Sequence, residues 1–236
     1  MLKSLLATSD DTIQLKQYII EHTLDHNIEQ VLVELLCHAC WAGSFESVKW
    51  LARTYNYDHR RPPPLFTPLV SACAGGHMHI AQWYVNTYNP SAEEAMADLA
   101  YVQACWGGHT DIIEWLLTCY TISDFSRING FNSVCRYGYL ELAKRLSVDP
   151  VIDASIKDAN IGVGLISACI WGQGPVYINS TKQIAVCNWL ENTYSILSDK
   201  RLCQFFTKES RQYYNPQMVE WLTEALQSHE TKLNPV

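Results

Sequence analysis

The sequence predicts an all-α protein built as a solenoid of stacked helix–turn–helix repeats. Two observations predict it: a cysteine that recurs about every 33 residues, and two helical patterns within each period. The recurring cysteines are Cys40, Cys73, Cys105, Cys135, Cys169 and Cys203. A period of this length over most of a chain indicates a repeat architecture, in which a helix pair buries its apolar face only by stacking on its neighbours.

The first helix of each unit is predicted from a short apolar segment that contains Ala-Cys and ends at a glycine, as in "ACWAG" from Ala39 and "ACAGG" from Ala72. Small residues allow neighbouring helices to approach closely. Glycine adopts the left-handed conformation that ends a helix, because it has no Cβ to clash with the backbone. The first helix should therefore stop at the glycine.

The second helix is clearest in residues 110–120, "TDIIEWLLTCY". Its apolar residues stand at positions i, i+1, i+4 and i+5, which predicts one buried face of a helix; they are Ile112, Ile113, Leu116 and Leu117. Thr110 or Asp111 is the expected N-cap. The segments 56–66 and 147–155 contain proline and polar residues, and we expect them to be connecting loops.

These patterns divide the chain into one continuous solenoid over residues 1–236. A leading helix at about 10–22 is expected to cover the open end of the stack. The repeats follow at about 30–62, 63–95, 96–125, 126–158, 159–196 and 197–230. In the fifth, Trp189 lies twenty residues after Cys169 rather than ten, so residues 173–182 are predicted to be a surface insertion between the two helices.

The composition of the chain argues against a nucleic-acid-binding or membrane-spanning protein. Hydrophobic residues make up 48% of the 236 residues, enough for a continuous core. The formal net charge of −7 offers no basic surface for nucleic acid, and no apolar run approaches the length of a membrane span. Without a recognisable secretory signal, we expect a cytoplasmic or otherwise intracellular monomer whose nine cysteines are reduced.

The segment Phe66–Val85, "FTPLVSACAGGHMHIAQWYV", resembles an ankyrin repeat. The matching residues are Thr67, Pro68, Leu69, Ala72, Gly76, His77 and Ile80, and the repeat from Ala104 keeps the Gly-His pair and the apolar second helix. The resemblance covers roughly residues 10–226 and is strongest in the middle. It implies a helical solenoid that binds another protein, and it implies that His77 hydrogen-bonds backbone at the helix corner.

Cys37-His38-Ala39-Cys40 is the one Cys-x-x-Cys pair in the chain. A zinc site needs a second ligand pair, and none recurs downstream, so we interpret the motif as structural. His77 and His79 stand at i and i+2, which do not face one another on a helix. We therefore expect no catalytic residue, no metal site and no cofactor. The alternative is a metal- or thiol-dependent enzyme using Cys37, His38 and Cys40.

The tryptophans form two groups. Those of the second helices are expected to pack between repeats; they are Trp50, Trp83, Trp115, Trp189 and Trp221. The others follow the recurring cysteine by one or two residues, positions that the resemblance places on the concave groove. With Arg136 and Tyr137 of repeat four and Tyr177 of the insertion, they are the expected partner-binding residues: Trp41, Trp106, Arg136, Tyr137, Trp171 and Tyr177.

Two interpretations of these groove residues stay open at this stage. They bind a partner protein, or they pack against adjacent repeats. A further alternative is that the chain is a passive spacer in a larger assembly. Divergent ankyrin chains with Ala-Cys and Trp-Leu repeats resemble those of large DNA viruses, amoebae and intracellular bacteria, which implies a host-targeting role as an extension of partner binding.

Overall fold

The computed structural model describes residues 28–58, 67–157 and 180–195, together with single residues between 217 and 227. The chain divides into two compact units, Met1–Ser126 (unit 1) and Arg127–Val236 (unit 2), and the boundary falls within one helix. The elements of the described part are all helices: α3 (Ile28–Ala42), α4 (Phe45–Thr54), α5 (Pro68–Gly75), α6 (Met78–Tyr88), α7 (Ala92–Ala95), α8 (Ala97–Gly107), α9 (Thr110–Cys119), α10 (Asp124–Arg136), α11 (Leu140–Leu146), α12 (Pro150–Lys157) and α14 (Ser180–Tyr194). The all-α prediction is confirmed.

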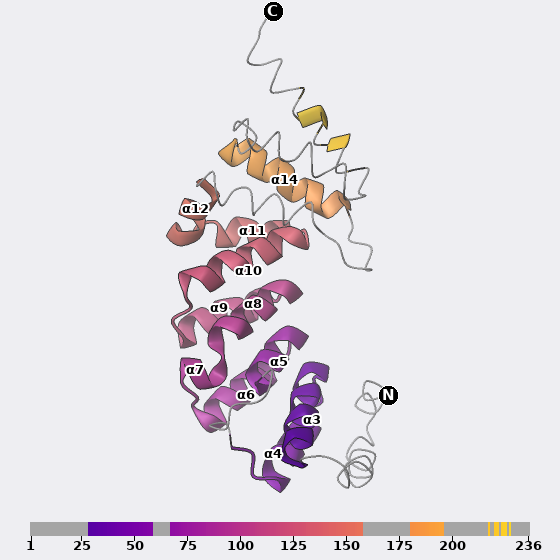
Figure 1. The fold of residues 1–236 in the computed structure, drawn as a ribbon, viewed down its shortest axis with the longest axis vertical. Coiled ribbons are helices and arrows are strands. Elements are labelled where there is room, and N and C mark those ends of the chain that lie inside the picture. Colours follow the sequence, from indigo (N-terminus) through magenta and orange to yellow (C-terminus); the bar gives the residue numbers. More distant parts are fainter. Residues whose placement is uncertain are drawn as a thin grey trace, which may run out of the picture. The chain divides into compact units, whose positions relative to one another are not determined.

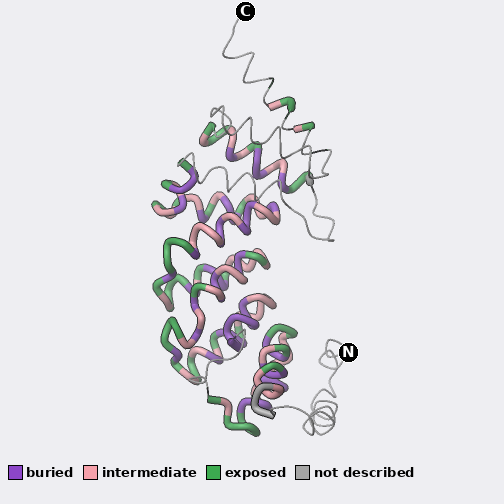
Figure 2. Tube along the Cα trace, viewed as in Figure 1, coloured by how far each residue is buried: buried purple, intermediate pink, exposed green. Residues whose placement is uncertain are grey.

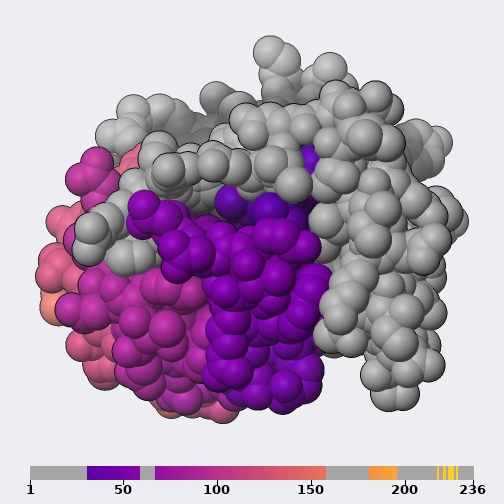
Figure 3. Space-filling view, turned by 90° about the horizontal axis from the view of Figure 1, so that it is seen from below, coloured from indigo at the N-terminus to yellow at the C-terminus, as the bar shows by residue number. Residues whose placement is uncertain are grey.

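Unit 1 is a stack of three helix pairs (Figure 1). The pairs are α3 with α4, α5 with α6, and α8 with α9, which we call repeats one, two and three. Helix α5 packs against both α3 and α8, so the first helices lie in chain order along the stack. Figure 3 shows repeat one, in indigo and purple, beside the magenta side chains of the following repeats. The predicted solenoid of helix–turn–helix repeats is confirmed here; its continuation as one domain over residues 1–236 stays a prediction.

Each first helix ends at a glycine in the left-handed conformation, as the sequence predicted. The φ angles are +78° at Gly43, +78° at Gly76 and +71° at Gly108. At Gly76 the backbone N–H donates to the carbonyl of Cys73, and the next N–H donates to the carbonyl of Ala72. These bonds satisfy carbonyls that a helix end otherwise leaves without a partner. The turn into the second helix is therefore fixed by backbone geometry.

The first helix of repeat two also begins at a defined residue. The side-chain oxygen of Thr67 accepts a hydrogen bond from the N–H of Val70 at 3.2 Å, and Pro68 occupies the first helical position. Proline suits this position because its φ is already helical and its missing N–H would have had no helical partner. The Thr67 hydroxyl donates to the carbonyl of Ala95 at 2.8 Å. One buried side chain therefore caps its own helix and binds the segment that precedes α8.

The core of each repeat is centred on the recurring cysteine. Cys40, Cys73, Cys105 and Cys135 are all fully buried, and an alanine or valine precedes each of them. Buried and exposed residues alternate along each helix with the helical period (Figure 2). The cysteines act as small apolar residues that let the first helices pack closely. Cys169 and Cys203 lie outside the described residues.

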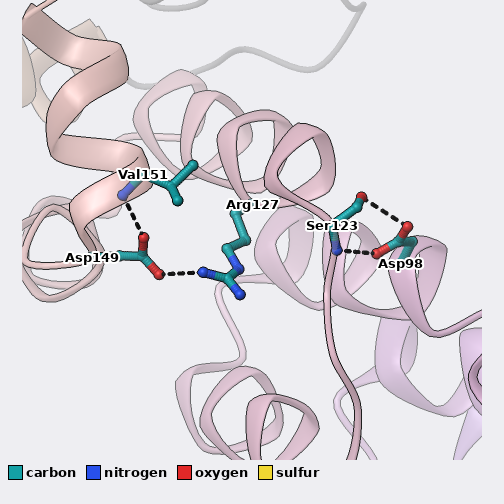
Figure 4. A network of polar contacts seen from close by, with 5 residues as sticks. All are labelled: Asp98, Ser123, Arg127, Asp149 and Val151. Carbon is teal, nitrogen blue, oxygen red and sulfur yellow. Dashed lines mark hydrogen bonds and ion pairs between the residues drawn. The ribbon is translucent and has the colours of Figure 1, made fainter.

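The prediction of a loop at 147–155 was wrong, because residues 150–157 form helix α12. Pro150 is its first residue, where proline is well tolerated. The carboxylate of Asp149 accepts the N–H of Val151 at 2.9 Å and binds the guanidinium of Arg127 at 3.1 Å (Figure 4). Proline and polar residues therefore marked a helix start here rather than an irregular loop.

The connection between repeats two and three contains a short helix of its own. The short helix α7 begins with a capping box, in which Ser91 and Glu94 each bond the other's backbone N–H. The α8 residue Asp98 then accepts two hydrogen bonds from Ser123, from its N–H at 2.9 Å and from its hydroxyl at 2.8 Å (Figure 4). These bonds hold the chain that leaves α9 against the start of α8.

Two details of the predicted second helix in repeat three were wrong. Leu117 is 39% exposed, whereas Ile112, Ile113 and Leu116 are buried. At 100° per residue, Leu117 lies about 90° from the middle of the face that the other three share, so it points away from the core. The N-cap is His109, one residue before the expected Thr110. Its side chain forms no bond to its own helix.

Candidate interaction surface

The histidines at the start of the second helices bind the neighbouring repeat. His77 Nε2 lies 3.0 Å from the carbonyl oxygen of Trp41, and His109 Nε2 lies 3.3 Å from that of Ala74. A carbonyl oxygen only accepts, so Nε2 is the protonated nitrogen in each ring. The role that the resemblance implied for His77 is confirmed, and the bond proves to join one repeat to the next. The matching bond of His109 was not predicted.

A glycine of the preceding repeat makes room for each of these rings. A Cβ at Gly43 would collide with the imidazole of His77, and a Cβ at Gly76 would lie 2.5 Å from Cε1 of His109. These glycines are therefore needed for two reasons: they adopt a positive φ that ends the helix, and the ring of the next repeat lies against them. Helix termination and stacking between repeats depend on the same residue.

Unit 2 contains the same arrangement with a different side chain. Gln183 Nε2 donates to the carbonyl of Arg136 at 2.7 Å, and a Cβ at Gly138 would lie 2.6 Å from Cβ of Lys182. Gln183 stands six residues before Trp189, as His77 stands six before Trp83. This places α14 as the second helix of a repeat, packed on α11. Sequence reasoning missed Gln183, although its spacing from the tryptophan was the available signal.

In repeats one, two and four, the backbone carbonyl of the residue after the recurring cysteine forms a hydrogen bond. The carbonyls of Trp41, Ala74 and Arg136 each accept a bond from the next repeat. The side chains at this position are then free to differ without loss of the backbone bond. A small residue occupies it in repeat two, and an indole occupies it in repeats one and three. The position is therefore a place where side-chain identity can vary between repeats.

The predicted groove residues differ in exposure. The indole of Trp41 is 41% exposed and that of Trp106 is 46% exposed, and both belong to unit 1. Arg136 and Tyr137 of unit 2 are half-buried, and the Tyr137 ring is 6.3 Å from that of Tyr139 in a stacked arrangement. Trp171 and Tyr177 lie outside the described residues, as does the predicted insertion except for its last three residues, which form the first turn of α14.

The second-helix tryptophans are half-buried and take part in packing. The ring of Trp83 packs edge-on against Phe45 of repeat one at a centroid distance of 5.9 Å, so for this residue packing between repeats is confirmed. Trp50, Trp83 and Trp189 also each meet a tyrosine five residues later, with centroid distances of 5.9, 5.9 and 6.1 Å. These edge-to-face pairs stabilise the C-terminal ends of α4, α6 and α14. The recurring Trp-x4-Tyr spacing was present in the sequence and was missed.

Three tyrosines pack together at the interface between repeats one and two. The ring of Tyr57 lies 6.4 Å from Tyr84 and 5.6 Å from Tyr88. Burial raises the pKa of the Tyr57 and Tyr84 hydroxyls well above the ordinary value, because the charged form is costly away from water. Tyr84 is 1% exposed and was not among the predicted core residues. It lies on the helix face that also buries Ile80 and Ala81.

The Cys37-x-x-Cys40 pair lies in this interior. Burial raises the pKa of the Cys37 thiol to about 12, against the lowering effect of its hydrogen bond with Ser71, and burial also raises the pKa of the Cys40 thiol well above its ordinary value. A nucleophile or metal ligand must be a thiolate, and burial in apolar surroundings disfavours that form. Within the described ranges, no three His, Cys, Asp or Glu side chains are grouped as a metal site. The geometry fits a packing role for both cysteines.

The comparisons with known proteins agree with the geometry of the stack. Residues 35–128 match the family model for ankyrin repeats in three copies. The matched residues include most of repeat one, all of repeats two and three, and the start of α10. No curated protein matches the chain. No helix in the described part is both long and apolar enough to cross a membrane. Residues 35–128 are therefore ankyrin repeats, and ankyrin repeats generally act as protein–protein interaction modules.

Proposed function

We propose that this protein binds a partner protein through the exposed side chains of its first helices and catalyses no reaction itself. The observation that carries the proposal is the exposure of Trp41 and Trp106 at equivalent positions of repeats one and three. The cysteine before each of them is fully buried. Large aromatic side chains on a rigid surface are the residues that contribute most to protein–protein binding. Arg136 and Tyr137 are proposed as a separate contact region on unit 2.

The helices that carry the exposed indoles are fixed in place by packing and by a hydrogen bond. The Trp41 carbonyl is held by His77, and α3 and α8 pack on either side of α5. A side chain on a preorganised backbone loses little conformational freedom when it binds, which favours affinity. The buried thiols argue for the same function, because a high pKa at Cys37 does not suit a thiol-dependent enzyme.

We also propose that the protein works inside a cell. The described cysteines carry free thiols, and six of the seven are buried or half-buried. Free thiols are typical of a reducing compartment. A host-directed role in a viral or bacterial setting is an extension of this proposal, based on the resemblance of its repeats. It is tested by identifying which proteome supplies the partner.

The test is affinity capture from cell lysate with the wild-type chain and with Trp106→Ala in parallel, followed by quantitative mass spectrometry. We expect at least one protein whose recovery falls tenfold or more with Trp106→Ala while the melting temperature stays the same. Phe125→Ala is the matched control, since Phe125 is a 75% exposed aromatic side chain on α10. Equal recovery of every captured protein by both variants would favour a passive spacer. A fall in melting temperature with Trp106→Ala would show that the indole is part of the packing.

A further inference from the structure

One core position of the second helices changes from leucine to tyrosine in repeat two. The residue that follows the second-helix tryptophan is Leu51 in α4, Leu116 in α9 and Leu190 in α14, and all three are buried. In α6 the same position is Tyr84, which is also buried. Repeat two therefore buries a hydroxyl group where these other helices bury a hydrocarbon side chain. Burial of a hydroxyl is costly unless it is hydrogen-bonded.

Two further polar groups of the same interface stand at positions that are apolar elsewhere. Tyr57 lies seven residues after the tryptophan of repeat one, where repeats two and three have a proline and an isoleucine. Cys37 lies three residues before the recurring cysteine of repeat one, where repeats two and three both have a valine. With Tyr84, three exceptions to the repeat pattern therefore occur at the interface between repeats one and two.

The hydroxyl groups of Tyr57 and Tyr84 lie close together inside this interface. The ring centroids are 6.4 Å apart, and both hydroxyl oxygens are shielded from solvent. The two hydroxyls influence one another, but their contact falls short of hydrogen-bond geometry. Among the residues that the structure describes, neither oxygen has another hydrogen-bond partner. Each oxygen therefore keeps both its donor and its acceptor capacity.

The thiol of Cys37 is a third polar group in the same region. Burial is the largest cause of the raised pKa of both tyrosine hydroxyls, and the nearby Cys37 thiol adds to it in each case. The thiol therefore lies near both hydroxyls. It also forms a hydrogen bond with the side chain of Ser71 on α5. A buried water molecule makes hydrogen bonds to about two to four polar groups, which is the number that this region offers.

We propose that the interface between repeats one and two binds one buried water molecule, held by the hydroxyls of Tyr57 and Tyr84 beside the Cys37 thiol. A water molecule accepts a hydrogen bond from one hydroxyl and donates one to the other, so a single molecule satisfies both groups. It joins the segment that follows α4 to the middle of α6. The site lies in the interior, so this inference is independent of any partner that binds the exposed surface.

Removal of one hydroxyl at a time tests whether the two tyrosines share a water molecule. Tyr57→Phe and Tyr84→Phe delete the oxygen and keep the ring. We expect each variant to lower the folding equilibrium constant, measured by urea unfolding, by at least about fivefold. Because both hydroxyls hold the same molecule, the double variant should lose much less than the product of the two single losses. Tyr55→Phe, at an exposed tyrosine of repeat one, is the control and should change the constant by less than about twofold.

Three results would overturn the proposal. If either phenylalanine variant is at least as stable as the wild type, the hydroxyl that it lacks was buried without a partner. If the two single losses multiply in the double variant, the hydroxyls share no ligand. A direct bond between the hydroxyls would also couple the variants, and a crystal structure of the wild-type chain separates these cases. We expect an ordered water molecule about 2.5–3.0 Å from both hydroxyl oxygens, and two oxygens bonded to one another without it would contradict the proposal.

Discussion

Replacing His109 with alanine removes the hydrogen bond that joins repeats two and three at the corner between first and second helix. The ring lies against Gly76, and its Nε2 donates to the carbonyl of Ala74 at 3.3 Å in a half-buried position. Loss of such a bond costs about 1 kcal/mol, and the abandoned carbonyl adds a desolvation cost of about 1–3 kcal/mol when it is fully buried. Because this site is only half-buried, we expect a total loss of about 1–3 kcal/mol in the free energy of unfolding.

Two matched variants isolate the hydrogen bond from the loss of a side chain. His109→Gln should recover most of the stability, because Gln183 already makes the equivalent bond to Arg136 at 2.7 Å. His38→Ala removes an exposed histidine from α3 and should change stability by no more than about 0.5 kcal/mol. From the most to the least stable, we therefore expect wild type, His38→Ala, His109→Gln and then His109→Ala.

The assay is urea unfolding followed by far-ultraviolet circular dichroism. With a slope of about 2 kcal/mol per molar urea, a loss of 2 kcal/mol lowers the midpoint by about 1 M. In a repeat protein the interface between neighbours also sets cooperativity, so His109→Ala should broaden the transition. If His109→Ala is no less stable than His38→Ala, or if His109→Gln is as unstable as the alanine variant, the bond does not hold the repeats together.

Three further predictions follow from the same structure. Burial, the largest effect, holds the pKa of His77 below its ordinary value of 6.5, so the unfolded chain binds the proton more readily than the folded chain. The free energy of unfolding should therefore fall as the pH decreases through 6.5. His77→Gln should reduce the difference between the urea midpoints measured at pH 7.5 and at pH 5.5. Gly43→Ala places a Cβ on a residue with φ +78° and against the His77 ring. The free energy of unfolding, measured with urea, should fall by at least about 1–2 kcal/mol. The control Ala42→Ser should change it little. Cys119 is exposed, whereas Cys40, Cys73, Cys105 and Cys135 are buried. Cys119→Ser should therefore remove one rapidly reacting thiol in titration of the native protein. An unchanged count of reactive thiols would contradict the exposure of Cys119.

The sequence by itself determined the architecture of the repeats. The period of the cysteines, the glycine at the end of each first helix and the apolar face of each second helix are local patterns. Each reports a local physical requirement: close helix packing, a positive φ, or burial at the helical period. For that reason they also predicted the fully buried row of Cys40, Cys73, Cys105 and Cys135, and the exposed indole at Trp106 was identified as a residue of interest.

The tertiary structure decided which residues meet across repeats. The bonds from His109 to Ala74 and from Gln183 to Arg136 join residues 35 and 47 positions apart, and no local propensity encodes such a pair. Leu117 was assigned to the core because its position in the sequence is apolar, but only the direction of the packed helix decides that it faces solvent. The sequence shows which residues recur at the helical period. Which residue each side chain contacts in the next repeat is set by how the helices stack. The repeats were therefore readable from the sequence, and the contacts between them required the fold.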